Sequence, residues 1–265
     1  MKVWTVSCQK GGVGKTTTVV TLGGLLASRG YKTLLVDLDP HGSLTSYFRM
    51  DPDTIEQSGY DLFRATINKA KLNIRGYIVE TEFENLSVIP AATAMATLDR
   101  QASGLDGMGL VVSSSLSQIS EEYDFVLLDT PPMLGVLLVN ALAACERLLI
   151  PVQTEFLALK GLERMMRTVQ MINRSRAEPI PYMIVPTMYD QRTRASIESL
   201  NSLQNRYSRN LWKGVVPVDT KIREASRLGS PASICTPNSR AALAYGKLLE
   251  SLLLKRKRSV QKMAI

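Results

Sequence analysis

The sequence contains little cysteine, and its three cysteines lie far apart. They are Cys8, Cys145 and Cys235 among 265 residues, and no CxxC pair is present. Structural zinc sites and disulfide frameworks both need several cysteines at characteristic spacings. The sequence therefore indicates neither kind of site, and we expect three reduced, largely buried thiols.

Long apolar runs are also missing. No stretch approaches the roughly 18 apolar residues that a membrane-spanning helix needs. The first residues, MKVWTVSCQKGG, have a short apolar segment followed by glycines, which is not the pattern of a signal peptide. Internal repeats and low-complexity linkers are absent too. We therefore expect a cytoplasmic protein in which residues 1–265 form a single domain with a hydrophobic core.

Acidic residues are scarce in the second part of the chain. Residues 1–159 contain 12 Lys and Arg against 17 Asp and Glu, a net charge of −5, whereas residues 160–265 contain 20 against 7, a net charge of +13. A KRKR cluster opens a basic tail at about 255–265. This asymmetry indicates an acidic partner such as nucleic acid, an anionic membrane or an acidic protein; a solvated basic face is the alternative.

Apolar, β-rich runs alternate with helical patterns along the chain. We predict strands at residues 3–7, 33–38, 87–90, 124–129, 147–152, 182–187 and 214–218, and helices at 15–29, 109–122, 136–145, 157–173, 195–207 and 239–255. This alternation predicts an α/β, doubly wound fold, whose mostly parallel sheet has helices on both faces. Residues 50–84 are the least regular, and we expect a surface elaboration there.

A glycine-rich segment, CQKGGVGKTTT (8–18), lies between the first predicted strand and helix. Its glycines let successive N–H groups face inward and let phosphate oxygens approach closely, and the helix N-terminus adds its dipole. We predict that Lys15 reaches the β- and γ-phosphates of a nucleotide and that the Thr16 hydroxyl binds Mg²⁺. This context disfavours a glycine turn without a ligand. The predicted nucleotide-binding residues here are Gly11, Gly12, Val13, Gly14, Lys15, Thr16 and Thr17.

Three aspartates stand where predicted strands end. Asp37 and Asp39 lie two residues apart, so their side chains point to the same side, and Asp129 ends a buried strand. A buried carboxylate is costly unless it meets a cation, and open α/β sheets bind ligands at the carboxyl ends of their strands. An aspartate there positions a water for in-line attack or holds the metal shell. The Asp-Pro-His-Gly sequence is also a turn signal whatever its function.

These motifs together resemble the deviant Walker ATPases of the ParA/MinD family. The resemblance covers KGGVGKTT, DLDPHGS and LLDTPP, and it continues through IPVQTEFLALKG, PTMYDQRT and RAALAYGKLLESLL. It implies a P-loop NTPase that slowly hydrolyses ATP to ADP and phosphate with Mg²⁺. It also implies that Lys10 reaches across an ATP-bound homodimer to the partner's phosphates. Lys15 would then be the ordinary loop lysine, and Asp39 would orient or activate the attacking water.

The resemblance assigns the remaining site residues as well. Asp37 and Asp129 would support the switch and the metal with Thr16, and Pro217 and Asp219 would lie near the adenine. A lysine supplied by the partner would stabilise transition-state charge as an arginine finger does. If each Lys10 serves the other subunit's site, the dimer closes with two-fold symmetry. Removal of the γ-phosphate would then loosen the dimer.

The sequence departs from chromosome-partition members of the family in two places. His41, the single histidine, stands where those members often have glutamine, and it could transfer a proton or simply make a polar or turn-capping contact. PVDTKIREA (217–225) replaces a segment with an Arg-Asn pair. The candidates for contact with nonspecific DNA are Arg192, Arg194, Lys221 and Arg223, together with the KRKR cluster.

Several functions are compatible with the family. DLDPHGSLTSYF, PVQTEFLALKGLERM, MINRSR and VPVDT most resemble members that position chemotaxis arrays at a cell pole, so we expect chemotaxis or polar-landmark partners. The alternative is a chromosome or plasmid partition ATPase that binds nonspecific DNA. SLLLKRKRSVQKMAI (251–265) has scattered apolar residues after its basic cluster, so no stable membrane anchor is expected. An iron–sulfur protein would need two suitably placed cysteines per chain, and a biosynthetic ligase a further substrate site; neither is found.

Overall fold

A seven-stranded sheet forms the centre of the molecule. The computed structural model describes the backbone of residues 1–263 and the side chains of residues 1–254. Its strands are β1 (Lys2–Val6), β2 (Thr33–Asp37), β3 (Val79–Glu80), β4 (Leu86–Ile89), β5 (Phe125–Asp129), β6 (Arg147–Gln153) and β7 (Tyr182–Thr187). They lie in the order β3-β4-β2-β5-β1-β6-β7. All neighbours are parallel except β3 and β4, which are antiparallel.

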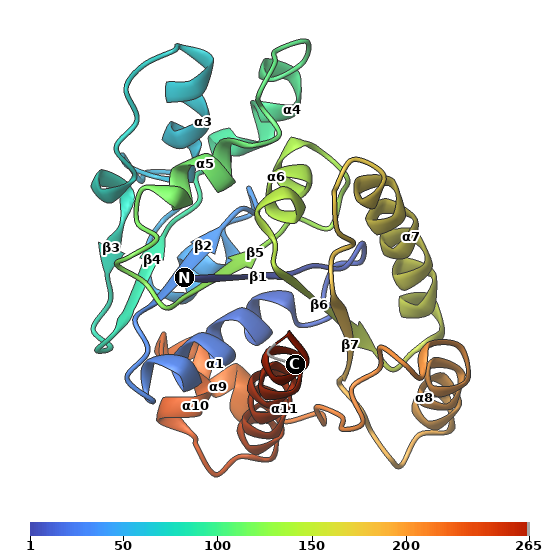
Figure 1. The fold of residues 1–265 in the computed structure, drawn as a ribbon. Helices are drawn as coiled ribbons and strands as arrows, with labels where there is room; N and C mark the ends of the chain where they lie inside the picture. The colour runs from blue at the N-terminus through green and yellow to red at the C-terminus, as the bar shows by residue number, and fades with distance from the viewer. Residues whose placement is uncertain (264–265) are drawn as a thin grey trace.

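Helices cover both faces of the sheet (Figure 1). One face carries α1 (Lys15–Ala27), α9 (Lys221–Leu228), α10 (Ala232–Cys235) and α11 (Arg240–Met263). The other carries α3 (Gly59–Ile67), α5 (Val111–Ser117), α6 (Val136–Ala144) and α7 (Phe156–Asn173). The remaining helices are α2 (Ser43–Tyr47), α4 (Leu98–Gln101), α8 (Arg194–Tyr207) and the 3-10 turns η1 (Ile74–Tyr77) and η2 (Thr93–Thr97).

Strand residues alternate between two cores, because successive side chains of a strand point to opposite faces. On β2, Leu35 packs in the core shared with α1 and α11, whereas Leu34 and Val36 pack in the core shared with α3, α5 and α6. All five β2 residues are buried, as expected for a strand of a parallel sheet covered on both sides. The predicted doubly wound, mostly parallel fold is confirmed.

Three predictions of local structure are corrected. Residues 214–218 form no strand, only a single bridge between Tyr189 and Pro217; Pro217 has no N–H to donate to a ladder. Residues 50–84 are more than a surface elaboration, because they contain α3, η1 and β3 and bury Leu62, Phe63 and Ile74. The helix expected at 109–122 covers only Val111–Ser117.

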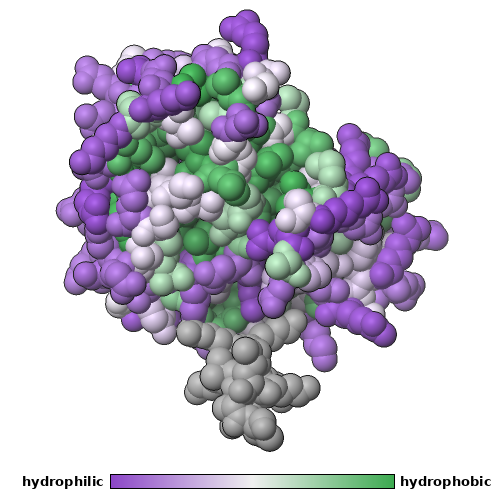
Figure 2. Space-filling model, turned by 45° about the horizontal axis from the view of Figure 1, so that its top comes forward, coloured by the Kyte–Doolittle hydropathy of each residue, from purple (hydrophilic) through white to green (hydrophobic). Residues whose placement is uncertain are grey.

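The C-terminal helix is longer than expected. α11 runs to Met263 rather than ending at residue 255. The side chains of the predicted basic tail at 255–265, including the KRKR cluster, lie outside the described residues. Within the described residues, no helix is long and apolar enough to cross a membrane. Figure 2 shows one face of the molecule, with apolar residues toward its middle and hydrophilic residues around most of its rim.

Candidate nucleotide and magnesium site

The glycine-rich loop connects β1 to α1 and leaves room for a ligand. Gly12 and Gly14 have φ values of +74° and +89°, a conformation that side chains with a β-carbon rarely adopt. A β-carbon on Gly11, Gly12 or Gly14 would meet no atom within 4 Å, so the space beside the loop is open. No side chain caps the N-terminus of α1. The first N–H groups of this helix are therefore available to an anion.

A cavity of about 560 Å³ lies against this loop. Lys15, on the first turn of α1, is 7% exposed at its edge. The cavity is lined by Gly11, Gly12, Gly14, Lys15, Thr16, Thr17, Asp39, His41, Ser43, Tyr47, Pro132 and Ser226. It therefore brings together most of the residues predicted to bind the phosphates. Sequence reasoning missed Tyr47 and Ser226, because they belong to α2 and α9, two short helices that no pattern revealed.

Two buried carboxylates end adjacent strands below the cavity. Asp37 and Asp129 are register neighbours on β2 and β5, and both are almost completely buried. Asp37 accepts hydrogen bonds from the backbone N–H and hydroxyl of Thr45, at 2.9 and 2.7 Å. Burial raises the pKa of both carboxyls, and the neighbouring Asp37 raises the pKa of Asp129 further. A cation placed beside them would favour their ionised forms.

The donors near Asp129 fit Mg²⁺. The Thr16 hydroxyl donates to Asp129 Oδ2 at 2.6 Å, so a hydroxyl and a carboxylate already stand together beside the loop. In the described part of the chain, no group of three or more His, Cys, Asp or Glu side chains could hold a metal ion unaided. Mg²⁺ usually takes one or two protein ligands and completes its shell with water and substrate phosphates. The arrangement suits a metal that arrives with a nucleotide.

Asp39 lies at the wall of the cavity and contacts His41. It is 8% exposed, and its Oδ1 accepts from the backbone N–H of His41 at 3.1 Å. The Nδ1 atom of the same histidine lies 2.9 Å from Oδ1. The predicted water-positioning carboxylate therefore faces the phosphate loop, and its histidine neighbour touches it directly.

Lys10 points away from this cavity. Its ammonium forms an ion pair with Glu155, the residue immediately before α7. The loop around Lys10 packs closely on that helix, since a β-carbon on Gly161 would lie 3.0 Å from Lys10 Cβ. Phe156 and Leu157 beside this ion pair are 68% and 64% exposed. The two loop lysines thus have different surroundings: Lys15 lines the cavity, and Lys10 lies at the surface.

The residues predicted to lie near adenine are outside the phosphate cavity. Pro217 lines a second cavity of about 840 Å³, which the side chains of Tyr189, Arg192, Trp212 and Arg240 also border. Asp219 accepts from the backbone N–H groups of Lys221 and Ala241, both at 3.0 Å, and so fixes the starts of α9 and α11. Contact of these residues with adenine stays a prediction.

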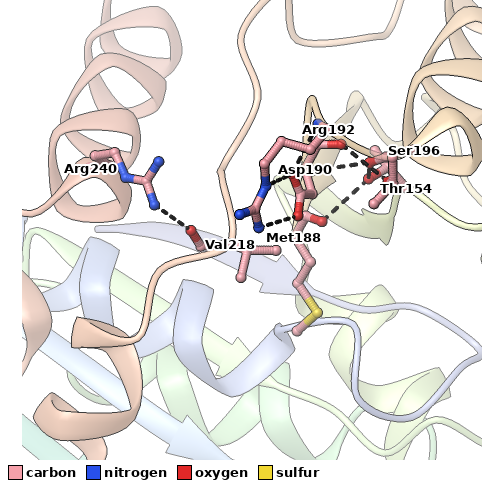
Figure 3. Close-up of polar contacts among 8 residues, drawn as sticks. Thr154, Met188, Asp190, Arg192, Ser196, Val218 and Arg240 are labelled. Atoms are coloured by element: carbon pink, nitrogen blue, oxygen red, sulfur yellow. Dashed lines mark hydrogen bonds and ion pairs between the residues drawn. The ribbon is translucent and has the colours of Figure 1, made fainter.

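Arg192 and Arg240 both line this second cavity, and Figure 3 shows that they come from different segments of the chain. Arg240 donates to the carbonyl oxygen of Val218 at 3.2 Å. Arg192 binds both oxygens of Asp190, at 2.9 and 2.7 Å, and lowers the pKa of Asp190 to about 2.

Two further candidates for contact with DNA also pair with carboxylates. Arg194 bonds Glu198 at 2.6 Å, and Lys221 bonds Glu224 at 2.8 Å. Arg223 has no carboxylate partner among the described side chains. Exposed ion pairs of this kind contribute little to stability and break readily. These cations therefore remain available to another anion.

Fold and site define the class of protein. A glycine loop between a strand and a helix, a lysine on that helix's first turn and aspartates at neighbouring strand ends are the features of a P-loop nucleotide-binding protein. A family model described as an AAA domain matches residues 1–180. The chain belongs to this AAA-domain family, among the ParA- and Soj-like ATPases.

Two curated relatives align along nearly the full chain. The sporulation initiation inhibitor protein Soj of Bacillus subtilis is 34% identical over 245 residues, which are 92% of this chain and 95% of Soj. The chromosome partitioning protein ParA of Myxococcus xanthus is 31% identical over 252 residues, 94% of this chain and 86% of ParA.

Solved structures share the fold. Cobyrinic acid a,c-diamide synthase from Mycobacterium smegmatis has been solved with bound ADP and magnesium, and with a bound ATP analog and magnesium. Both structures are 29% identical to this chain with a TM-score of 0.82, and the match covers 97% of this chain and 96% of theirs.

Proposed function

We propose that the protein is a Mg²⁺-dependent ATPase that works as a dimerising switch in the partition or positioning of a cellular cargo. The observation that supports this most is the separation of the two loop lysines. Lys15 lines the phosphate cavity, whereas Lys10 is held at the surface by Glu155. This separation supports a role for Lys10 at a site other than its own. The two curated relatives described above carry names from chromosome partition or sporulation.

The reaction follows from the side chains around the cavity. Bound Mg²⁺ would neutralise phosphate charge, and Thr16 with Asp129 would hold it beside the loop, supported by Asp37. Lys15 and the N–H groups of the loop bind the β- and γ-phosphates. Asp39 orients the attacking water at the γ-phosphate. Because these groups are fixed by strand ends and a helix start, little reorganisation is needed when charge develops in the transition state.

The dimer would pair two copies through the surface around Lys10. Exposed apolar side chains next to Lys10 and in the segment after β5 would be buried against the partner subunit. They are Met133, Leu134, Phe156 and Leu157. In a two-fold dimer each Lys10 exchanges Glu155 for the phosphates of the neighbouring subunit. ATP then links the subunits, and loss of the γ-phosphate releases them.

Replacing Lys10 by alanine is expected to prevent ATP-dependent dimerisation while preserving ATP binding by the monomer. The reason is that Lys10 lies outside its own cavity, so its loss leaves the phosphate contacts of Lys15 intact. Light scattering would give the mass with and without ATP, and a fluorescent nucleotide would report binding. Lys160→Ala, which removes an exposed lysine of α7 paired with Glu163, is the matched control. A dimer of ordinary stability in Lys10→Ala would refute the proposed role.

Nonspecific DNA is the partner that the charge distribution favours. Residues 160–265 have a net charge of +13, and the exposed cations Arg192, Arg194, Lys221 and Arg223 lie in that part. Phosphate contacts need only Lys and Arg and bring a steep dependence on salt. The exposed pairs with Glu198 and Glu224 cost little to break. DNA would serve as the surface on which the ATP-bound dimer assembles.

The Arg223→Ala variant is expected to bind DNA more weakly, and equally so for every sequence. Removing one phosphate contact should reduce the slope of log K against log salt by about one. Fluorescence anisotropy with labelled duplexes at several salt concentrations measures both quantities in the presence of ATP. Lys71→Ala, an exposed change in the acidic part of the chain, serves as the control. If the unsubstituted protein showed no salt dependence, the proposed DNA surface would be wrong.

A chemotaxis array is a second candidate cargo. The resemblance of DLDPHGSLTSYF and PVQTEFLALKGLERM to members that position such arrays is what favours it, and with that role the protein would be cytoplasmic and concentrated at a cell pole. A pull-down with the ATP-trapped Asp39→Ala protein separates the candidates. Recovery of chemotaxis signalling proteins would support the array, whereas recovery of a centromere-binding partition protein would support chromosome or plasmid partition.

A further inference from the structure

His41 occupies a fixed place beside the carboxylate that we assign to the attacking water. The turn that carries it is closed by a hydrogen bond from Gly42 N–H to the carbonyl of Asp39, at 2.8 Å. Gly42 has a φ of +61°, and a β-carbon there would lie 2.6 Å from Pro52 Cβ. Pro40 restricts the turn further, because its ring fixes its own φ. The backbone of residues 39–42 is therefore held from both sides.

The hydrogen bonds of the Asp39 carboxylate involve only one of its two oxygens. Its Oδ1 receives the backbone N–H of His41 at 3.1 Å and lies 2.9 Å from the imidazole Nδ1. No donor among the described residues contacts Oδ2. Because Asp39 lines the phosphate cavity, this second oxygen remains for a water molecule.

We propose that His41 is a positioning residue for ATP hydrolysis, which holds Asp39 through the Nδ1 hydrogen bond so that Oδ2 is directed at the attacking water. The inference rests on the proposed role of Asp39. A carboxylate accepts, so Nδ1 must carry the proton in this contact. A displacement of about 1 Å in a catalytic group reduces rates by roughly a hundredfold. A side chain that prevents rotation of Asp39 is therefore expected to affect turnover strongly.

The His41 side chain is well exposed, with 81% of it accessible. An exchange of this residue therefore disturbs no buried packing, and its effect on turnover reports the contact with Asp39.

Two substitutions test the hydrogen bond. His41→Ala removes the donor, whereas in His41→Asn the amide nitrogen takes the place of Nδ1. We expect His41→Ala to lower kcat about ten- to a hundredfold, with unchanged ATP affinity and ATP-dependent dimer mass. We expect His41→Asn to recover much of that loss, because it restores a hydrogen-bond donor to Asp39. Because the side chain is exposed, neither variant should unfold, and circular dichroism checks this.

Magnetic resonance gives an independent measurement, because the chain has one histidine. The ¹⁵N signals of its imidazole should report Nδ1–H near neutral pH, and this proton should become labile in Asp39→Ala. Unchanged kcat in His41→Ala, equal losses in His41→Ala and His41→Asn, or an Nε2–H ring would each overturn the proposal. Undiminished turnover in Asp39→Ala would instead overturn the assignment of Asp39. The two failures are therefore distinguishable.

Discussion

Asp39→Ala is expected to abolish multiple turnover and to leave the protein as a persistent ATP-bound dimer. Asp39 lines the phosphate cavity but belongs to neither the glycine loop nor the pair formed by Thr16 and Asp129. Its loss would therefore remove the group proposed to orient water and spare the groups proposed to hold the nucleotide. Removal of a positioned base typically lowers a rate by about 10²- to 10⁴-fold. Since the γ-phosphate is no longer cleaved, the link between subunits remains.

This result is measured by phosphate release and by the mass of the ATP-incubated protein over time. Asp53→Ala is the matched control, since it removes an exposed aspartate from the following loop. Ordinary turnover in Asp39→Ala would reassign the role to another carboxylate. A monomer with tightly bound ATP would argue instead that Asp39 contributes to dimerisation.

Lys15→Ala is expected to remove ATP binding altogether at ordinary concentrations. Lys15 is 7% exposed and lies on the first turn of α1, so in the proposed site it would meet phosphate oxygens in partly desolvated surroundings. Truncating one partner of a buried, hydrogen-bonded charge pair costs about 2–5 kcal/mol, which corresponds to at least roughly thirtyfold in Kd. The positive charge of Lys15 also opposes the raised pKa of Asp129. Its loss therefore weakens the metal ligand as well.

Isothermal titration with ATP and Mg²⁺ measures this effect directly. Lys213→Ala, which removes an exposed lysine far along the chain, controls for the change in total charge. Binding of normal affinity by folded Lys15→Ala would exclude the loop as the nucleotide site. Dimerisation and turnover should disappear together with binding in this variant.

Much of the fold was predictable because its strands are continuous apolar runs. TLLVD and FVLLD are buried at every residue and could be recognised without tertiary information. Residues 214–218 look equally apolar, but Pro217 prevents a ladder and the segment only follows the edge of β7. In residues 50–84 the burial of Leu62 and Phe63 depends on packing against distant elements. The capping box formed by Ser58 and Asp61 could have marked the start of α3 locally, whereas the packing of this helix on the sheet could not be read from the sequence.

The candidate site was predictable as far as its motifs extend. The glycine loop, Thr16, Asp39 and Asp129 meet at one edge of the sheet because parallel strands end there together. The ion pair between Lys10 and Glu155 could not be predicted, since it joins residues 145 positions apart. The hydrogen bond from His41 to Asp39 could have been suggested by the turn, but its geometry needs the fixed backbone of residues 39–42.

The central claim, that Lys10 completes the neighbour's site, is tested most directly by mixing Lys10→Ala with Asp39→Ala. Both variants should bind ATP, and each alone should lack turnover. In a mixed dimer, the Lys10→Ala subunit keeps its own Asp39 and receives Lys10 from its partner, so one complete site forms. The account predicts ATP hydrolysis well above the sum of the separate proteins. Differently tagged subunits, mixed before ATP is added, show whether the mixed dimer forms. A mixed dimer that hydrolyses no ATP would contradict the account, because Lys10 would then act only within its own subunit.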